Sequence, residues 1–407
     1  MSKTLIQHWI SSRTKPVPGA TVASPPMVMP QAAQAVPAVQ TLPVWPLPTD
    51  QELRVLFDRE HEVCPFHGWV AQDSAIRQLT NIIATGLRDK HHRLPSSTAL
   101  LHVGMRSSGK TQAAEVLFSD KALALPYMKV NAKEIRGIQT ILQFLFNIAE
   151  QAGHPLVPMG EENGRTLYEM IPCGLIMDEL HAMMVPIMDE MLNMLEADDH
   201  TLSTPDCMVN VRNVIWVGCT TEHGTLFDKH DAFESRFEKI EFVGYTRDEV
   251  AEILQRNFRD WTHRECELLA VYAGRIVREA KKMAAKVERE LMSMKLHDPT
   301  TTRITAIREV GKQLGIDDNG MSKKQIKVLD ALARRWPKGM TLGQLAQVIG
   351  DKEDKVKHLV LPALELDAAD HPALVCRPSR TFITKAGMEE LLRRGQIDQE
   401  QVDKFDT

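Results

Sequence analysis

One segment of eight residues has the residue types and the spacing of a phosphate-binding loop. Residues 104–111, Gly-Met-Arg-Ser-Ser-Gly-Lys-Thr, fit the pattern GxxxxGKS/T, follow an apolar run and precede a helical pattern over residues 112–118. In such a loop, backbone N–H groups close around the phosphates, the lysine reaches the β- and γ-phosphates, and the hydroxyl ligates Mg²⁺. The segment therefore predicts that ATP and Mg²⁺ are bound by Gly104, Ser107, Ser108, Gly109, Lys110 and Thr111.

A second apolar run, over residues 174–177, ends in the acidic pair Asp178 and Glu179. At the end of a buried strand, the two carboxylates of such a pair can have different roles in ATP hydrolysis. Asp178 would share the Mg²⁺ with Thr111, and Glu179 would polarise the water that attacks the γ-phosphate. An isolated Asp-Glu pair is usually solvated surface, but this pair lies behind a strand-like run and downstream of a phosphate-binding loop. It therefore indicates a catalytic pair.

A third apolar run, over residues 214–218, leads into Cys219, Thr220 and Thr221. Hydroxyl groups in this position would lie at the carboxyl edge of the sheet, where open α/β folds bind their ligands. We take Thr220 as the sensor of the γ-phosphate. For either threonine, the alternative is a hydroxyl that caps a turn.

Arg236 is flanked by Phe233 and Phe237, a pattern that suggests a helix end from which a guanidinium projects. Supplied to the nucleotide of a neighbouring subunit, such a group stabilises the charge on the transferring phosphate. Arg236 is therefore a candidate arginine finger. The alternative is an ordinary surface ion pair.

The elements that must position these residues follow from the hydrophobic pattern. Short apolar runs alternate with helical segments, which is typical of an α/β fold with a parallel sheet. These runs cover residues 97–103, 126–130, 173–177 and 214–218. Residues 239–243 are also strand-like, and from residue 246 onward the pattern becomes helical. The helical stretches cover residues 246–261, 265–272 and 275–294.

The last part of the chain has a different pattern. Helical stretches over 326–335 and 342–349 precede two strand-like segments, 373–377 and 381–384, around a Pro-Ser turn, which suggests a winged helix. The predicted domains are an N-terminal arm (1–50), an α/β nucleotide-binding domain (51–245), a helical lid (246–318), a winged-helix domain (319–394) and a tail (395–407).

The N-terminal arm has the composition of a tether. Residues 14–50 are dominated by Pro, Ala, Val, Gln and Ser, which offer few bulky side chains to bury. Ahead of them, apolar residues at helical spacing could dock on a partner protein or form a sticky disordered end. These residues are Leu5, Ile6, Trp9 and Ile10.

The composition limits the other possibilities. The formal net charge of −5 gives no overall basic field, so any DNA contact must come from a local patch. Six separated cysteines without a CxxC pair predict reduced thiols and a cytoplasmic protein, and no apolar run is long enough to span a membrane. Cys64 and His67 form one CxxH pair, for which we favour a loop cysteine beside a histidine over a zinc site.

Taken in order, these motifs resemble RuvB, the family of AAA+ motors that moves Holliday junctions in DNA recombination and repair. Residues 69–73 resemble the segment that lines this family's adenine pocket, which implies that Val70 contacts the nucleotide. Residues 277–280 are similar to the sensor-2 helix, which implies the same role for Arg278, with Arg275 as the second choice. The resemblance covers about residues 51–394.

This resemblance implies a fold and an activity. The fold would be an α/β AAA+ P-loop sheet with a helical lid, followed by a C-terminal winged-helix domain. The activity would be ATP hydrolysis coupled to helicase-like translocation on branched or duplex DNA. A homo-oligomeric ring, which is a hexamer in this family, would carry it out in the nucleoid. Arg377 and Arg380 would lie on the wing and contact DNA, although the winged helix could serve protein contacts alone.

Several features depart from the family. Residues 105–108 replace a loop interior that is usually smaller and richer in Pro and Gly, and the arm and an insertion at 366–371 are foreign to the family. Residues 196–214, where the family carries a hairpin for its RuvA partner, are several residues short, which puts dependence on RuvA in doubt. Two other hypotheses therefore remain open: an AAA+ matchmaker that recruits a transposase, helicase or nuclease to DNA, and an AAA+ protein remodeller that does not need DNA.

Overall fold

The computed structural model describes residues 46–403 except for 90, 93, 95–97, 155, 157, 163, 197–199, 206, 222–229, 366–371 and 377–379. Most of the predicted arm and the predicted DNA contact Arg377 therefore lie outside the described residues. Contacts within the chain divide it into two units. One contains residues up to 103 and 109–241, and the other contains 104–108 and the residues from 242 onward.

The first unit is built on a five-stranded sheet with the order β2-β5-β8-β1-β9. Its strands are β1 (Thr98–Gly104), β2 (Tyr127–Asn131), β5 (Cys173–Asp178), β8 (Val214–Thr220) and β9 (Glu238–Phe242). The neighbours β2/β5, β5/β8 and β8/β1 are parallel. All seven residues of β8 are buried, as expected for a central strand that is covered on both faces. The predicted α/β class with its parallel sheet is confirmed.

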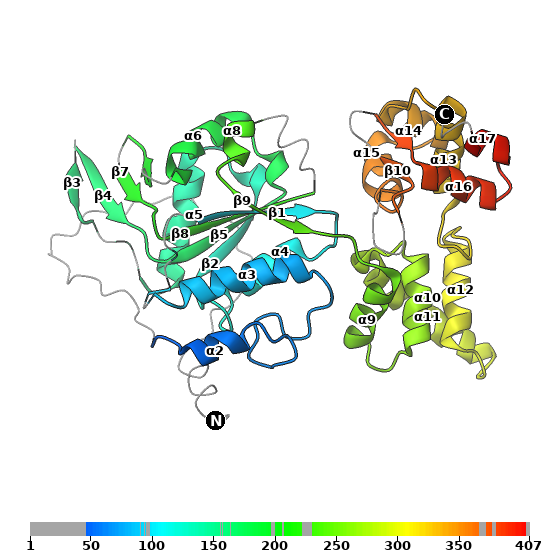
Figure 1. Ribbon diagram of the computed structural model, residues 1–407, viewed down its shortest axis with the longest axis horizontal. Coiled ribbons are helices and arrows are strands. Elements are labelled where there is room, and N and C mark those ends of the chain that lie inside the picture. The colour runs from blue at the N-terminus through cyan, green and yellow to red at the C-terminus, as the bar shows by residue number, and fades with distance from the viewer. Residues whose placement is uncertain are drawn as a thin grey trace. The chain divides into compact units, whose positions relative to one another are not determined.

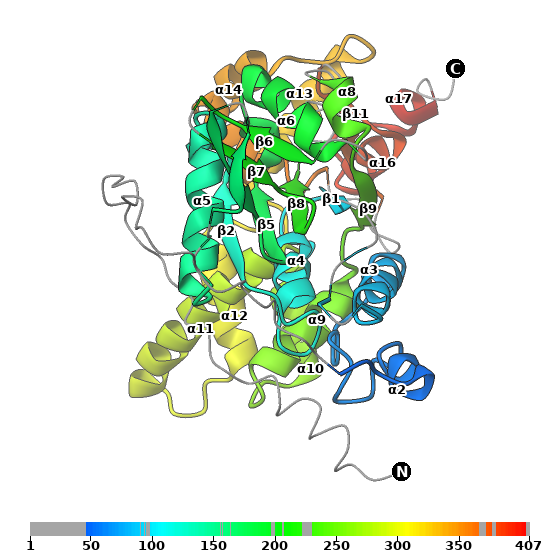
Figure 2. The ribbon, with the colours of Figure 1, turned by 90° about the vertical axis from the view of Figure 1, so that its left-hand side faces the viewer.

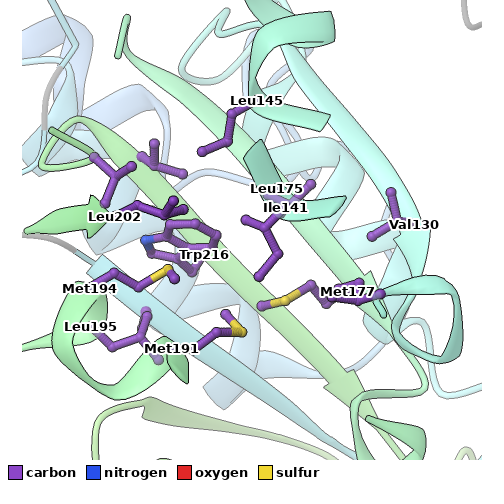
Figure 3. Close-up of a cluster of buried hydrophobic side chains, with 14 of the residues drawn as sticks. Val130, Ile141, Leu145, Leu175, Met177, Met191, Met194, Leu195, Leu202 and Trp216 are labelled. Carbon is purple, nitrogen blue, oxygen red and sulfur yellow. The ribbon is translucent and has the colours of Figure 1, made fainter. Parts of the chain in front are cut away.

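Helices cover both faces of this sheet. In Figures 1 and 2, α3 (Asp73–Gly86) and α4 (Lys110–Phe118) lie on one face, and α5 (Ile138–Gln151) and α6 (Val185–Leu195) lie on the other. The second face holds a large cluster of buried apolar side chains, with Trp216 of β8 fully buried near Leu175 of β5 (Figure 3). Methionines of α6, whose flexible side chains fill irregular gaps, pack into the same cluster.

A second, four-stranded sheet was not predicted. It has the order β3-β4-β7-β6 and contains β3 (Gly160–Glu162), β4 (Arg165–Glu169), β6 (Thr201–Ser203) and β7 (Cys207–Asn210). Strands of three to five residues are too short to give a clear alternation of apolar and polar positions. The antiparallel pair β6/β7 lies within residues 196–214, the segment that is several residues shorter than in the family. Despite this shorter length, the segment forms a hairpin.

The second unit begins with the helices expected for the lid. These are α9 (Arg247–Asn257), α10 (His263–Tyr272), α11 (Val277–His297) and α12 (Arg303–Gln313). Thr246 and Thr262 each form a capping box at the start of a helix. Arg303 joins the helices through ion pairs with Glu265 and Glu288, at 3.3 and 2.8 Å.

The C-terminal part of this unit contains the predicted helices and the predicted hairpin. Its elements are α13 (Lys323–Arg335), α14 (Leu342–Ile349), α15 (Glu353–Lys355), a π-helical turn (Val356–Val360), β10 (Val375–Cys376), β11 (Phe382–Ile383), α16 (Lys385–Arg393) and α17 (Gln399–Asp403). β10 and β11 are antiparallel. Val402 of α17 is buried in the same apolar cluster as Leu329 and Leu345, so the packed domain extends past residue 394. Its assignment as a winged helix stays a prediction.

Candidate nucleotide site

The predicted phosphate-binding loop connects β1 to α4. Gly104 has φ +148°, and a Cβ atom there would lie 2.1 Å from the carbonyl oxygen of Phe242, so only glycine fits. Gly109 has φ +96° and precedes α4 without any side-chain hydrogen bond at the cap. Ser108 donates a hydrogen bond to the Met105 carbonyl at 2.9 Å. The positive dipole end at the N-terminus of α4 favours a phosphate at this loop.

The backbone of Lys110, the first residue of α4, is held by His102, a residue that we did not single out from the sequence. The carbonyl of Lys110 accepts a hydrogen bond from Nδ1 of His102, which is fully buried on β1, at 3.0 Å. Burial, together with the charge of Lys110, lowers the pKa of His102 to about 4, although the hydrogen bond to the carbonyl opposes this shift. At neutral pH, the backbone at Lys110 is therefore hydrogen-bonded to an uncharged imidazole.

We expect His102 to make the stability of the protein depend on pH. The ordinary pKa of 6.5 falls to about 4 on folding, so between these values the unfolded chain binds more protons. Because of this histidine, the free energy of unfolding is about 3 kcal/mol higher above pH 6.5 than near pH 4. This stabilisation is lost as the pH falls from 6.5 toward 4. Urea unfolding of the wild type and of His102→Gln from pH 7.5 to 4.5 measures it. The variant should lose less stability over this range, and equal losses would contradict the prediction.

The acidic pair lies at the end of β5, as predicted. The Thr111 hydroxyl lies 3.4 Å from both carboxylate oxygens of Asp178. The backbone N–H of Glu179 donates to Asp178 Oδ1 at 3.0 Å. Glu179 itself has a left-handed backbone, with φ 56° and ψ 46°, which is uncommon for a residue other than glycine. A hydroxyl and a carboxylate are the oxygen ligands that Mg²⁺ prefers, so this pair fits the predicted metal.

Glu179 and Thr220 are joined by one histidine. His181 lies in the turn Leu180–Ala182, which follows Glu179 directly. Its Nδ1 is 3.0 Å from the Thr220 hydroxyl, and its Nε2 is 3.4 Å from Glu179 Oε2. Thr220, the last residue of β8, is buried. The structure therefore brings Thr111, Asp178, Glu179 and Thr220 to the same edge of the sheet.

Arg236 follows the short helix α8 (Asp231–Glu234). Its Nη1 donates to the Ala232 carbonyl at 2.9 Å, and its Nη2 pairs with the Glu196 carboxylate. His230 fixes α8, because it accepts a hydrogen bond from the Phe233 N–H at 3.0 Å and contacts Asp189 at 2.6 Å. Within one chain, Arg236 thus forms the ion pair that was the alternative to a finger. A role in a neighbouring subunit stays a prediction.

Three further residues are predicted to contact the nucleotide. Val70 is buried in a segment that Arg59 holds through a hydrogen bond to the Ala71 carbonyl at 2.8 Å. Arg278 is the second residue of α11, and Arg275 has a left-handed backbone with φ 60°. Val70, Arg278 and the second choice Arg275 therefore stay predictions as nucleotide contacts.

The CxxH pair has other partners. The Cys64 thiol donates to the Leu56 carbonyl at 2.9 Å, and Nδ1 of His67 lies 3.1 Å from the Arg59 carbonyl. Burial raises the pKa of Cys64, which keeps its thiol protonated. Over the described ranges, we find no cluster of three or more His, Cys, Asp or Glu side chains that could hold a metal ion. Among the helices that the structure describes, none is long and apolar enough to cross a membrane.

Comparisons with known proteins bear on the fold of the chain. Residues 100–245 match the family model of the ATPase family associated with various cellular activities (AAA). Among similar solved structures is the Thermotoga maritima RuvB Holliday junction branch migration motor, with a TM-score of 0.57 and 18% identity over 79% of this chain and 95% of that chain. A point mutant of the same RuvB gives 0.58 and 19%, over 79% and 96%. No curated protein has a significantly similar sequence. The chain thus has the fold of a RuvB-like AAA+ ATPase, as the motifs predicted.

Proposed function

We propose that this protein is an ATP-driven ring motor that acts on DNA, most specifically in branch migration or translocation at Holliday junctions or other branched DNA. The observation that carries this proposal is the arrangement of Thr111, Asp178, Glu179 and Thr220 at one edge of a RuvB-like sheet. The match to RuvB supports it further, because it covers 95% of the RuvB chain and is not confined to an AAA domain.

Each side chain has a defined part in ATP hydrolysis. Lys110 would bind the β- and γ-phosphates, while Thr111 and Asp178 would hold the Mg²⁺, which neutralises charge on the phosphates when bound. Glu179 would polarise the attacking water. Thr220 would donate a hydrogen bond to the γ-phosphate.

Completion of the site needs a second subunit. Arg236 would leave Glu196 and reach the nucleotide of the neighbouring subunit, so hydrolysis requires a ring, which we expect to be a hexamer. Because the finger acts between subunits, hydrolysis in one subunit is tied to the state of the next. That coupling is what a ring motor would pass on to DNA.

A basic face in the C-terminal domain supports contact with DNA. Residues 323–338 carry six exposed basic side chains and one acidic side chain, although the whole chain has a net charge of −5. Arg380, a predicted wing residue, donates to the Lys338 carbonyl at 3.4 Å and therefore joins this face. We define the basic face as Lys323, Lys324, Lys327, Arg334, Arg335, Lys338 and Arg380. Clustered lysines and arginines bind phosphates with little dependence on sequence.

We expect ATP hydrolysis to be stimulated more by a four-way junction than by linear duplex, with junctions converted to duplexes in the same reaction. The double variant Lys338→Ala with Arg380→Ala should weaken DNA binding and lower the slope of log K against log salt by about two. A charge-matched control is Lys281→Ala with Lys286→Ala, two exposed lysines of α11 outside the basic face.

Other outcomes of this experiment would favour the other hypotheses. A hydrolysis rate that is indifferent to DNA would contradict the motor and favour a protein remodeller. DNA stimulation without movement of junctions would favour a matchmaker. If both double variants weaken DNA binding equally, the basic face is not the DNA site.

A further inference from the structure

The proposed mechanism does not use His181, although this residue lies between two groups of the site. The ring contacts Thr220 through Nδ1 and Glu179 through Nε2, at 3.0 and 3.4 Å. The His181 side chain is 14% exposed and Thr220 is buried, so their contact is shielded from water, whereas the Glu179 side chain is 48% exposed. We propose that His181 is a positioning residue that transmits contact with the γ-phosphate from Thr220 to the carboxylate of Glu179. This inference rests on the proposed ATP hydrolysis at this site.

In the neutral form of His181, the nearby Glu179 carboxylate favours one direction for the hydrogen bond between Nδ1 and Thr220. The Glu179 carboxylate can only accept, so the proton of a neutral imidazole is stabilised on Nε2, which faces it. Nδ1 is then an acceptor. The Thr220 hydroxyl has a single proton, and it must donate that proton to Nδ1. In this arrangement, Thr220 has no proton left for another acceptor.

The γ-phosphate would compete for that proton. Its oxygens accept hydrogen bonds, so Thr220 can donate to His181 or to the phosphate, but not to both. Binding of ATP would therefore break the bond between Thr220 and His181, whereas ADP, which lacks the γ-phosphate, would leave it intact. Once released from Thr220, His181 would keep its contact with Glu179 and would orient this carboxylate toward the attacking water.

Both partners of His181 lie at the ends of buried strands of the sheet. The Glu179 N–H is bonded to Asp178, and the left-handed conformation of Glu179 follows a buried strand. Thr220 is 1% exposed and ends another buried strand. Because both anchors belong to the sheet edge, a change at Thr220 reaches Glu179 through the ring of His181.

The test compares His181→Leu, which removes both contacts, with His181→Gln, whose amide can still accept from Thr220 and donate to Glu179. For His181→Leu we expect roughly two- to tenfold tighter binding of a non-hydrolysable ATP analogue with Mg²⁺, because no hydrogen bond has to be broken. Affinity for ADP should stay within twofold. Turnover of ATP without DNA should fall roughly 10- to 100-fold, because Glu179 is no longer oriented. His181→Gln should return both values toward the wild type.

Titration calorimetry and steady-state kinetics give these values, and a thermal unfolding midpoint close to that of the wild type shows that the variants fold. In a Thr220→Val background, His181→Leu should not change the affinity for the ATP analogue. A parallel loss of affinity for the analogue and for ADP, or unchanged turnover, would overturn the proposal. Failure of the ATPase itself would appear in the wild type, so the two failures are distinguishable.

Discussion

Replacing Arg236 by alanine is expected to lower ATP hydrolysis by a factor of about 10³ to 10⁵ while the affinity for ATP changes little. A guanidinium supplied by a neighbouring subunit stabilises charge that develops only during transfer of the phosphoryl group. The fold should survive, because the ion pair with Glu196 is partly exposed and contributes at most about 1 kcal/mol. Steady-state turnover and equilibrium binding of ATP measure the two quantities separately.

Mixing experiments distinguish action in trans from a structural role. In a mixture of Arg236→Ala and Glu179→Gln subunits, some interfaces combine an intact arginine with an intact glutamate, so part of the activity should return. Glu196→Gln is the matched control, because it removes the partner of Arg236 and leaves the guanidinium. Its turnover should stay close to that of the wild type. If mixing restores no ATP hydrolysis, Arg236 either acts on the nucleotide of its own chain or only stabilises the fold.

The second large effect is expected for Glu179→Gln, which should lower turnover by roughly 10²- to 10⁴-fold. The amide cannot accept the proton of the attacking water, while the proposed nucleotide ligands Lys110, Thr111 and Asp178 would remain in place. The variant should therefore accumulate with ATP bound, and rings should persist with ATP. Single-turnover hydrolysis and sedimentation with ATP measure these two results.

The control for this variant is Glu238→Gln, the same substitution at an exposed carboxylate on β9. It should hydrolyse ATP at the wild-type rate. Retention of substantial turnover by Glu179→Gln would mean that another group activates the water. A loss of ATP affinity equal to the loss of turnover would instead indicate that Glu179 is needed to build the site.

Local patterns were sufficient to predict most of the elements that carry the site. The strands predicted at 173–177 and 214–218 are observed as Cys173–Asp178 and Val214–Thr220, because long apolar runs bounded by polar residues leave few alternatives. The helix predicted at 342–349 is observed with those bounds. The phosphate-binding loop could be predicted for the same reason, since its glycines, lysine and threonine lie at fixed spacing on a contiguous segment.

The sheet β3-β4-β7-β6 could not be predicted in this way. Its strands are short, and β4 and β7 pair in parallel although about forty residues separate them in sequence. Such a pairing depends on how the two strands pack against the rest of the domain, and not on the residue pattern within either strand. The same holds for His102, whose neutrality follows from complete burial under the loop.

The sequence by itself determined which chemical groups are present and which strand or loop carries each of them. Tertiary structure alone decided their partners, because the contacts join residues far apart in the chain. Thr111 meets Asp178 across 67 positions, His181 meets Thr220 across 39, and Arg236 meets Glu196 across 40. Side-chain pairs at such separations depend on the order and register of the strands, which no local pattern encodes. For that reason the sequence left the finger and the ion pair as equal alternatives for Arg236, and only the folded chain revealed its contact with Glu196.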